Sequence, residues 1–150
     1  MKINLSDPQT AEDYIWNEIP IAKSLSLKVL KTNPNVEVEL PIQENKNNKD
    51  TAFAGSMASG CFLAGWLTVQ IEADQVCKSD VFISKSSIDY LLPITADFQV
   101  IMNPILDKNK SLFLKMLERK GKAKVAVSAQ IVSQGKTCAR FSGEYAALKN

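Results

Sequence analysis

One uncharged segment constrains the fold of this chain more than any other feature. The segment NKDTAFAGSMASGCFLAGWLTVQI, residues 48–71, has no charge after Asp50 and is apolar on every side of a helix. A helix without a polar face must be surrounded on all sides, either by lipid or by the rest of its own protein. The chain therefore either crosses a membrane with this segment or wraps its other elements around it.

A membrane crossing has some support, because the uncharged run approaches the ~20 residues that a bilayer span needs. Small residues also recur in it at four-residue spacing, as in packed membrane helices: Ser56, Gly60 and Ala64. However, the run is poor in Leu, Ile and Val, and no cluster of Lys or Arg adjoins either end. We therefore expect no membrane-spanning segment, and instead one long buried helix that ends between Ala73 and Val76.

Size and charge indicate a single ordinary domain over residues 1–150. A chain of this length can bury ~70% of the surface that its unfolded form exposes. The 18 basic and 16 acidic side chains leave a net charge of +2, far from the basic balance of a nucleic-acid-binding protein. No apolar stretch follows Lys2, so the start does not resemble a secretory signal.

The cysteines and the missing histidines exclude several kinds of site. The three cysteines are an odd number without CxxC spacing, which argues against a disulfide framework and a structural zinc site. Histidine is absent, so neither a Ser-His-Asp or Cys-His pair nor a His-rich metal site can form within this chain. We expect a cytoplasmic protein with no metal and no cofactor.

Local patterns predict the remaining elements. Asp7 and Pro8 favour the start of a helix that runs to about Asn17, because aspartate caps helices and proline suits the first helical position. Period-two alternation predicts strands, and an apolar stripe closed by Gly121 predicts a second, amphipathic helix near residues 112–120. The strands are expected at 24–31, 36–42, 80–90, 96–103, 122–133 and 136–148, with a polar loop at 43–50.

An antiparallel sheet with one apolar face needs a partner, and the apolar helix needs cover all round. The fold class is therefore α+β, with an antiparallel sheet wrapped around one long central helix. The pattern N-x-x-T-A-F-A-G-S from Asn48, continued by A-G-W, and the segments 87–93 and 119–123 then reveal a resemblance. From Ile19 onward, the chain resembles the hotdog fold and its thioesterase-like domains of the YiiD C-terminal type.

The resemblance implies an acyl-thioester substrate, carried on coenzyme A or on an acyl carrier protein. It also implies a homodimer, or a dimer of dimers, with each site between the start of one central helix and the surface of the partner subunit. Neither a nucleic acid nor a membrane is expected as a partner. Hydratases and dehydratases of this fold fit less well, because they commonly use a histidine.

The start of the central helix is the candidate active site. Backbone N–H groups around Ala54, Gly55 and Ser56 lie in the first turn, where they are unpaired and at the positive end of the helix dipole. They can polarise a thioester carbonyl and stabilise the oxyanion that forms when water attacks. Gly55 leaves room for the substrate. Phe53 and Met57 can line the acyl group, although such spacing is more often that of a core.

The general base is not evident. Hotdog thioesterases often carry a carboxylate about two turns inside the central helix, where this chain has Ser59-Gly60-Cys61-Phe62-Leu63-Ala64. Asn48 can orient water or simply form a turn, and Asp50 can activate water or simply cap the helix. Asp89 and Tyr90 can reach the site from a strand end, or can be ordinary strand residues.

Two readings of function follow. The first is an acyl-thioester hydrolase that works by direct attack of water, because Ser56 has no histidine to activate it as a nucleophile. The second is a non-catalytic module that binds acyl-CoA or an acyl carrier. Basic residues near the amphipathic helix predicted at 112–120 can bind coenzyme A phosphates or form a solvated helix end: Lys115, Arg119, Lys120, Lys122 and Lys124.

Overall fold

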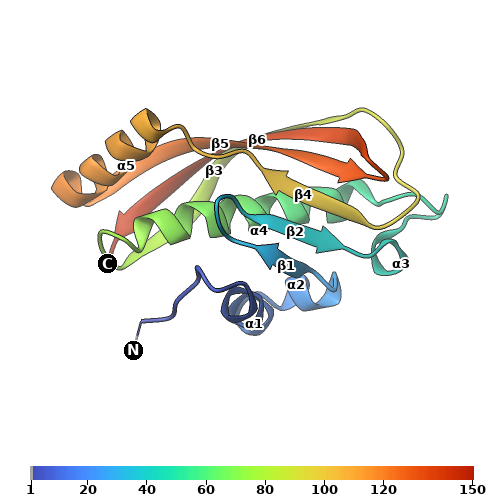
Figure 1. The fold of residues 1–150 in the computed structure, drawn as a ribbon, viewed down its shortest axis with the longest axis horizontal. Coiled ribbons are helices and arrows are strands. Elements are labelled where there is room, and N and C mark those ends of the chain that lie inside the picture. The colour runs from blue at the N-terminus through green and yellow to red at the C-terminus, as the bar shows by residue number, and fades with distance from the viewer. Residues whose placement is uncertain (1) are drawn as a thin grey trace.

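The computed structural model describes residues 2–150 and forms one antiparallel sheet curved around a long helix (Figure 1). The helices are α1 (Pro8–Glu18), α2 (Pro20–Ser24), α3 (Ile42–Asn45), α4 (Ala54–Ala73) and α5 (Asp107–Lys120). The strands are β1 (Lys28–Lys31), β2 (Glu37–Leu40), β3 (Ser79–Tyr90), β4 (Phe98–Met102), β5 (Lys122–Ser133) and β6 (Lys136–Lys149).

The sheet has six strands in the order β1-β2-β4-β5-β6-β3, and every neighbouring pair is antiparallel. Inward and outward side chains alternate along β5, where every second residue is buried. Helix α4 lies in the concave side and contacts β2, β3, β4, β5 and β6 (Figure 1). This arrangement confirms the predicted α+β class and is the hotdog fold.

The body of α4 is held by close packing against the sheet. Tyr145 of β6 is 1% exposed and donates a 2.8 Å hydrogen bond to the carbonyl of Phe62. Its hydroxyl occupies the space that a Cβ at position 65 would need, so a glycine at Gly65 permits this contact. At Gly60 the approach is less tight, because a Cβ there would lie 3.0 Å from Cδ1 of Leu40. The small residues of α4 therefore serve helix–sheet packing in this fold.

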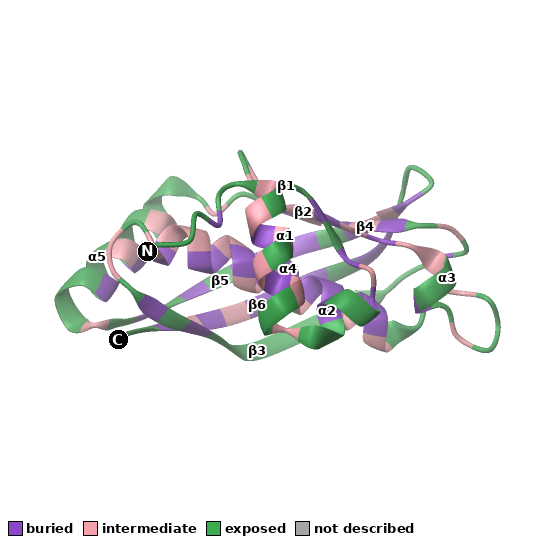
Figure 2. Cartoon of the chain, turned by 90° about the horizontal axis from the view of Figure 1, so that it is seen from below, coloured by how far each residue is buried: buried purple, intermediate pink, exposed green. Residues whose placement is uncertain are grey.

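The two edges of the sheet differ in cover. At the β1 edge, the Val29 N–H donates to Oε1 of Glu12 on α1, and the Trp16 indole donates to the carbonyl of Leu27. Helix α1 thus covers a strand of only four residues. At the other edge, most of the twelve residues of β3 are exposed (Figure 2). Large apolar side chains are exposed on β3 and just after it: Phe82, Ile83, Tyr90, Leu91 and Leu92.

The sequence predicted the long elements correctly and missed the short helices. The strand predicted from Ser24 begins only at Lys28, because α2 and a turn with Ser26 at φ +53° precede it. The predicted loop at 43–50 contains α3. Both helices have five residues or fewer, which is too short for a 3.6-residue period to show in the sequence.

Candidate functional site

The start of α4 has no side-chain cap. Phe53 occupies the N-cap position, and its carbonyl accepts hydrogen bonds from the N–H groups of Ser56 and Met57 at 3.0 and 3.1 Å. The N–H groups of Ala54 and Gly55 form no hydrogen bond within residues 2–150. Two backbone donors at the positive end of a 20-residue helix are therefore free to bind an anion or a carbonyl oxygen.

A cavity of about 350 Å³ lies at this helix start. It is bounded by the first turn of α4, the end of β3 and the segment that follows β3. Its lining consists of Asn47, Ala52, Ala54, Met57, Tyr90, Leu91, Leu92, Pro93 and Ile94. The walls are mostly apolar, with one amide and one phenol as polar side chains, as in many small-molecule sites.

Phe53 lies over the first turn of α4. A Cβ at position 55 would collide with Cε2 of the Phe53 ring, so Gly55 is required for the ring to rest there. The ring itself is 54% exposed and does not belong to the cavity lining. The glycine therefore lets the neighbouring ring cover one side of the first turn, and Gly55 itself lies outside the cavity lining.

The loop before α4 is organised by Asn47. Its Oδ1 accepts hydrogen bonds from the N–H groups of Lys49 and Thr51 at 2.8 and 3.2 Å, and its Nδ2 donates to the Thr51 hydroxyl at 2.9 Å. A backbone bond from Asn47 N–H to Thr51 O closes the same turn. The asparagine thereby fixes the chain just before the helix and faces the cavity.

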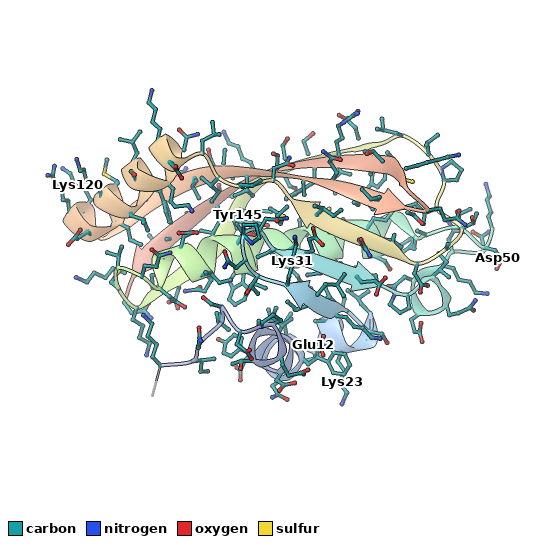
Figure 3. All side chains as sticks on the ribbon, in the orientation of Figure 1. Glu12, Lys23, Lys31, Asp50, Lys120 and Tyr145 are labelled. Carbon is teal, nitrogen blue, oxygen red and sulfur yellow. The ribbon has the colours of Figure 1, made fainter. Side chains whose placement is uncertain are left out.

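Asn48 and Asp50 lie on the tip of this turn. Both are exposed, and neither lines the cavity. Asp50, at one end of the molecule in Figure 3, adopts φ +59°, and its side chain is 82% exposed. It forms a 3.2 Å ion pair with Nζ of Lys46. It is not the cap of α4, because Phe53 holds that position. The catalytic roles of Asn48 and Asp50 stay predictions.

Of the other predicted residues, the structure places Ala54, Met57 and Tyr90 in the cavity lining. The Tyr90 hydroxyl is 3.4 Å from the carbonyl of Ala54, which joins the end of β3 to the start of α4. Asp89 pairs with Arg140 in the sheet register and, by strand alternation, points to the opposite face from Tyr90. Ser56 is 7% exposed and lies outside the lining.

Among the residues that the structure describes, no carboxylate, lysine or thiol lines the cavity. Burial raises the pKa of the Tyr90 hydroxyl, and the nearby Cys61 raises it further. Burial also raises the pKa of the Cys61 thiol to about 12, so this group stays protonated and unreactive near neutral pH. Within residues 2–150, no three His, Cys, Asp or Glu side chains gather as a metal site would require.

Two larger cavities lie elsewhere. One of about 630 Å³ is on the outer face of the sheet beside the start of α5, where Asp107 already places a carboxylate in the first turn. The other, of about 670 Å³, lies beside the second half of α4, between Trp66 and the N-terminal segment. Neither borders a helix start whose first turn lacks an acid, so the smaller cavity remains the candidate site.

Asn47 is the polar lining residue that the sequence analysis missed. Three asparagines stand close together in the loop, at positions 45, 47 and 48. Only Asn47 has a threonine four residues later with which its amide forms a closed turn. That spacing is the signal that distinguishes it, because asparagine side chains often bond to backbone groups a few residues ahead. Ala52 and residues 91–94 were also missed: Ala52 and residues 91–93 belong to segments that carry the family resemblance, but the residue types gave no reason to place them in the site.

Comparisons with known proteins define the class. The family model described as "Putative thioesterase (yiiD_Cterm)" matches residues 9–149, so the chain belongs to this family. The match extends over nearly the whole chain, from the first helix to the last strand, and confirms the resemblance seen in the sequence. Among curated proteins, no sequence matches this chain.

Solved structures show the same fold. A protein of unknown function from Chlorobaculum tepidum has a TM-score of 0.88 at 22% identity, covering 99% of this chain and 100% of that one. A "putative thioesterase" from Shewanella oneidensis has a TM-score of 0.83 at 26% identity, covering 94% of this chain and 96% of that one. A thioesterase from Haemophilus influenzae has a TM-score of 0.76 at 11% identity, covering 95% of this chain and 91% of that one.

The helices of the structure also bear on the membrane crossing that the uncharged segment raised as an alternative. None of the helices within residues 2–150 combines the length and apolar character that a bilayer crossing demands. Helix α4 instead has 11 of its 20 residues buried against the sheet. The sheet therefore supplies the cover that the sequence required for this segment.

Proposed function

We propose that this protein hydrolyses acyl thioesters at the start of α4. Water adds to the thioester carbonyl carbon, and the free N–H groups of Ala54 and Gly55 hold the oxygen as it becomes an oxyanion. The carbon–sulfur bond then breaks, which releases a carboxylic acid and a thiol. Two aligned donors suit a developing negative charge better than a neutral carbonyl, so they favour the transition state over the bound substrate.

The observation that carries this proposal is the uncapped first turn beside an apolar cavity in a member of a thioesterase family. The apolar walls suit an acyl group, with Met57, Leu91 and Leu92 in contact with it. The charge of the oxyanion then forms where two donors already point, so little reorganisation is needed during the reaction.

The loop before α4 supplies the polar groups that handle water. Asn47 faces the cavity, and Asn48 and Asp50 occupy the same turn. We keep the proposal that Asn48 orients water and that Asp50 accepts its proton, with Asp89 as a carboxylate that a second subunit can supply. Since the Asp50 side chain is exposed, it reaches substrate only if the substrate or a partner subunit extends over the turn.

A homodimer through β3 accompanies the proposed function. A long, exposed edge with apolar side chains favours pairing with another strand. Two copies related by a two-fold axis would pair their β3 strands antiparallel, which sets the Tyr90 end of one strand against the Ser79 end of the other. The start of each α4 would then lie beside the partner. The three free cysteines agree with a reducing compartment, for which we propose the cytoplasm.

One observation favours the second candidate function, a non-catalytic module that binds acyl-CoA or an acyl carrier. The cavity lining contains no carboxylate and no other group that can serve as a base at neutral pH. A protein that kept the pocket without a base would bind thioesters tightly and leave them intact.

The test is thiol release by the purified protein from a panel of acyl-CoA esters of different chain length, repeated with Asn47→Ala, Asn48→Ala and Asp50→Ala. Hydrolysis by the unaltered protein, with a lower kcat in at least one variant, supports the hydrolase and assigns the water-handling residue. Tight binding without thiol release supports the binding module. Neither binding nor release from any ester contradicts both proposals.

A further inference from the structure

The basic charge of this protein is concentrated at α5. Residues 107–124 contain seven of the 18 basic side chains and two of the 16 acidic ones, so this segment carries +5 and the remainder carries −3. Lys110 and Lys124 are neutralised by ion pairs with Glu72 and Glu144 at 3.2 and 3.6 Å. The other five basic side chains, all exposed, have no carboxylate within ion-pair distance in the described residues.

Five exposed residues form what we call the basic face of α5: Lys108, Leu112, Lys115, Met116 and Arg119. At 3.6 residues per turn they fall within an arc of about 100°, on a different side from the buried Phe113 and Leu117. Leu112 and Met116 are 58% and 49% exposed and stand one turn apart between the cations. The helix therefore presents an apolar pair, with cations beside it, to whatever lies outside.

We propose that this basic face docks an acidic acyl carrier protein, which brings the thioester to the site proposed above. An acidic helix on the carrier would pair with the three cations, while its apolar side chains meet Leu112 and Met116, as when a helix lies on an apolar strip. The inference rests on the proposed function and selects the carrier over coenzyme A as the source of the thioester.

Other partners fit this face less well. Coenzyme A phosphates favour donors that converge in a cavity, whereas the basic face is a convex helix surface that lines none of the three cavities described above. A membrane surface would need a wider apolar stripe than two side chains. A nucleic acid would meet the net −3 of the rest of the chain, and the pI of 8.4 is below that of basic nucleic-acid-binding domains.

The position of α5 agrees with delivery to a second copy. Within one chain, the end of α5 at Lys120 and the turn at Asp50 lie at opposite ends of the molecule (Figure 3). A two-fold axis through paired β3 edges reverses one copy, so that α5 of one chain lies at the end where α4 of the partner begins. From β5, on which α5 packs, the partner's β3 is three strand spacings away, about 14 Å. A flexible prosthetic arm can extend over that span.

The experiment compares one acyl group on two carriers, octanoyl-CoA and an octanoylated acyl carrier protein, with the purified full-length protein. The variant Lys115→Glu/Arg119→Glu reverses the charge of the basic face. The matched control Lys23→Glu/Lys28→Glu makes the same charge change at exposed positions of α2 and β1. Thermal unfolding of both variants verifies that they are folded.

We expect the α5 variant to lower kcat/KM for the acylated carrier protein by about 10-fold or more and to leave octanoyl-CoA within about 2-fold, because complementary charge acts mainly on encounter with the charged partner. The control should change neither. An equal loss with both substrates, or no loss with either, overturns the inference.

Binding of the non-acylated holo carrier protein, measured by calorimetry at low and high salt, keeps the test independent of turnover. Salt-sensitive binding that the α5 variant abolishes supports the docking face, even if no thioester is hydrolysed and the proposed function fails. No binding at low salt overturns the inference while leaving the hydrolase intact. Binding of the α5 face to phosphatidylserine vesicles in place of the carrier also overturns it.

Discussion

The start of α1 is capped by a side chain, whereas the start of α4 is not. At α1, the Asp7 carboxylate accepts hydrogen bonds from the N–H of Thr10 at 2.9 Å and from the Thr10 hydroxyl at 2.7 Å. At α4, Phe53 stands at the corresponding position and offers no side-chain acceptor. A side-chain cap stabilises a helix start and also occupies its donors. The comparison shows a helix start with its donors capped at α1 and one with two N–H groups left free at α4.

The surroundings of the two starts strengthen this contrast. The start of α1 is exposed to water, which can satisfy any remaining donor. At α4, Ala54 is exposed as well, but the first turn also borders a mostly apolar cavity. Helix α5 also lacks a side-chain cap, but Asp107 in its first turn supplies negative charge there. The free donors of α4 are therefore set apart by the cavity that adjoins them.

The largest effect is expected when the start of α4 is given an aspartate cap like that of α1. Phe53→Asp should place a carboxylate on the N–H groups of the first turn, which competes with the oxyanion. We expect thioester hydrolysis to fall by about 100-fold or more, as when donors to an oxyanion are removed, while the melting temperature rises.

The control for this change is Phe53→Ala, which removes the ring without adding an acceptor. It should retain activity within about 10-fold of the unaltered protein, since the backbone donors remain free. If Phe53→Asp and Phe53→Ala lose activity equally, the ring rather than the free donors accounts for the effect.

The packing around the body of α4 should make the fold less stable at alkaline pH. Burial raises the pKa of Cys61 to about 12 and raises that of Tyr145 as well. The folded state thus favours both protonated groups, so their contribution is complete below the pKa values of the unfolded chain and is lost as pH rises above them. The free energy of unfolding, measured with urea, should fall progressively above about pH 9.

Cys61→Ala sharpens this prediction. The variant is less stable at neutral pH, because a buried side chain is shortened, but it lacks the group that titrates first. Its stability should change little between about pH 9 and 10, before tyrosines ionise. The same loss in the variant and the unaltered protein over that interval would assign the alkaline transition to other groups.

A smaller change at the approach to α4 should reduce activity alone. Asn47→Ala removes the amide that fixes the turn at Thr51, so the first turn of the helix is held less firmly. We expect kcat to fall by about 10-fold, because misplacement of catalytic groups is costly. Circular dichroism should show an unchanged fold. Full activity in this variant would mean that the turn does not position the helix start.

The smallest effect belongs to α1. The hydrogen bonds from Thr10 hold the pKa of Asp7 below its ordinary value, so the cap contributes above the pKa of the unfolded chain and is lost as pH falls through the folded value. Asp7→Ala should lower the melting temperature by a few degrees at pH 7 and leave hydrolysis unchanged. This difference should shrink below about pH 4. A loss of hydrolysis would contradict the division of roles between the two helices.

The sequence predicted this contrast only in part. Asp7 before Pro8 was readable as a cap, and the absence of charge from Thr51 to Ile71 required a sheet around one helix. Local patterns do not show which loop side chains turn inward. The family resemblance indicates Asn48, and nearness in sequence indicates Asp50, whereas in the folded chain it is Asn47 that lines the cavity.

The cavity itself was also beyond the sequence. Five of its nine lining residues are Tyr90 and the four that follow it, some 36 residues from Ala54 along the chain. These residues meet because β3 runs back along α4, and no local periodicity encodes that return. The sequence predicted β3 as a strand, but its exposed position at the edge follows from the order of strands in the sheet.

The most direct measurement of the central claim is the amide NMR spectrum of the labelled protein during titration with a 2-oxoalkyl-CoA, in which a methylene group replaces the thioester sulfur and the carbonyl remains. We predict that the N–H signals of Ala54 and Gly55 move downfield more than any others, since their donors would meet the carbonyl oxygen. Saturable binding that leaves these two signals in place would contradict the account.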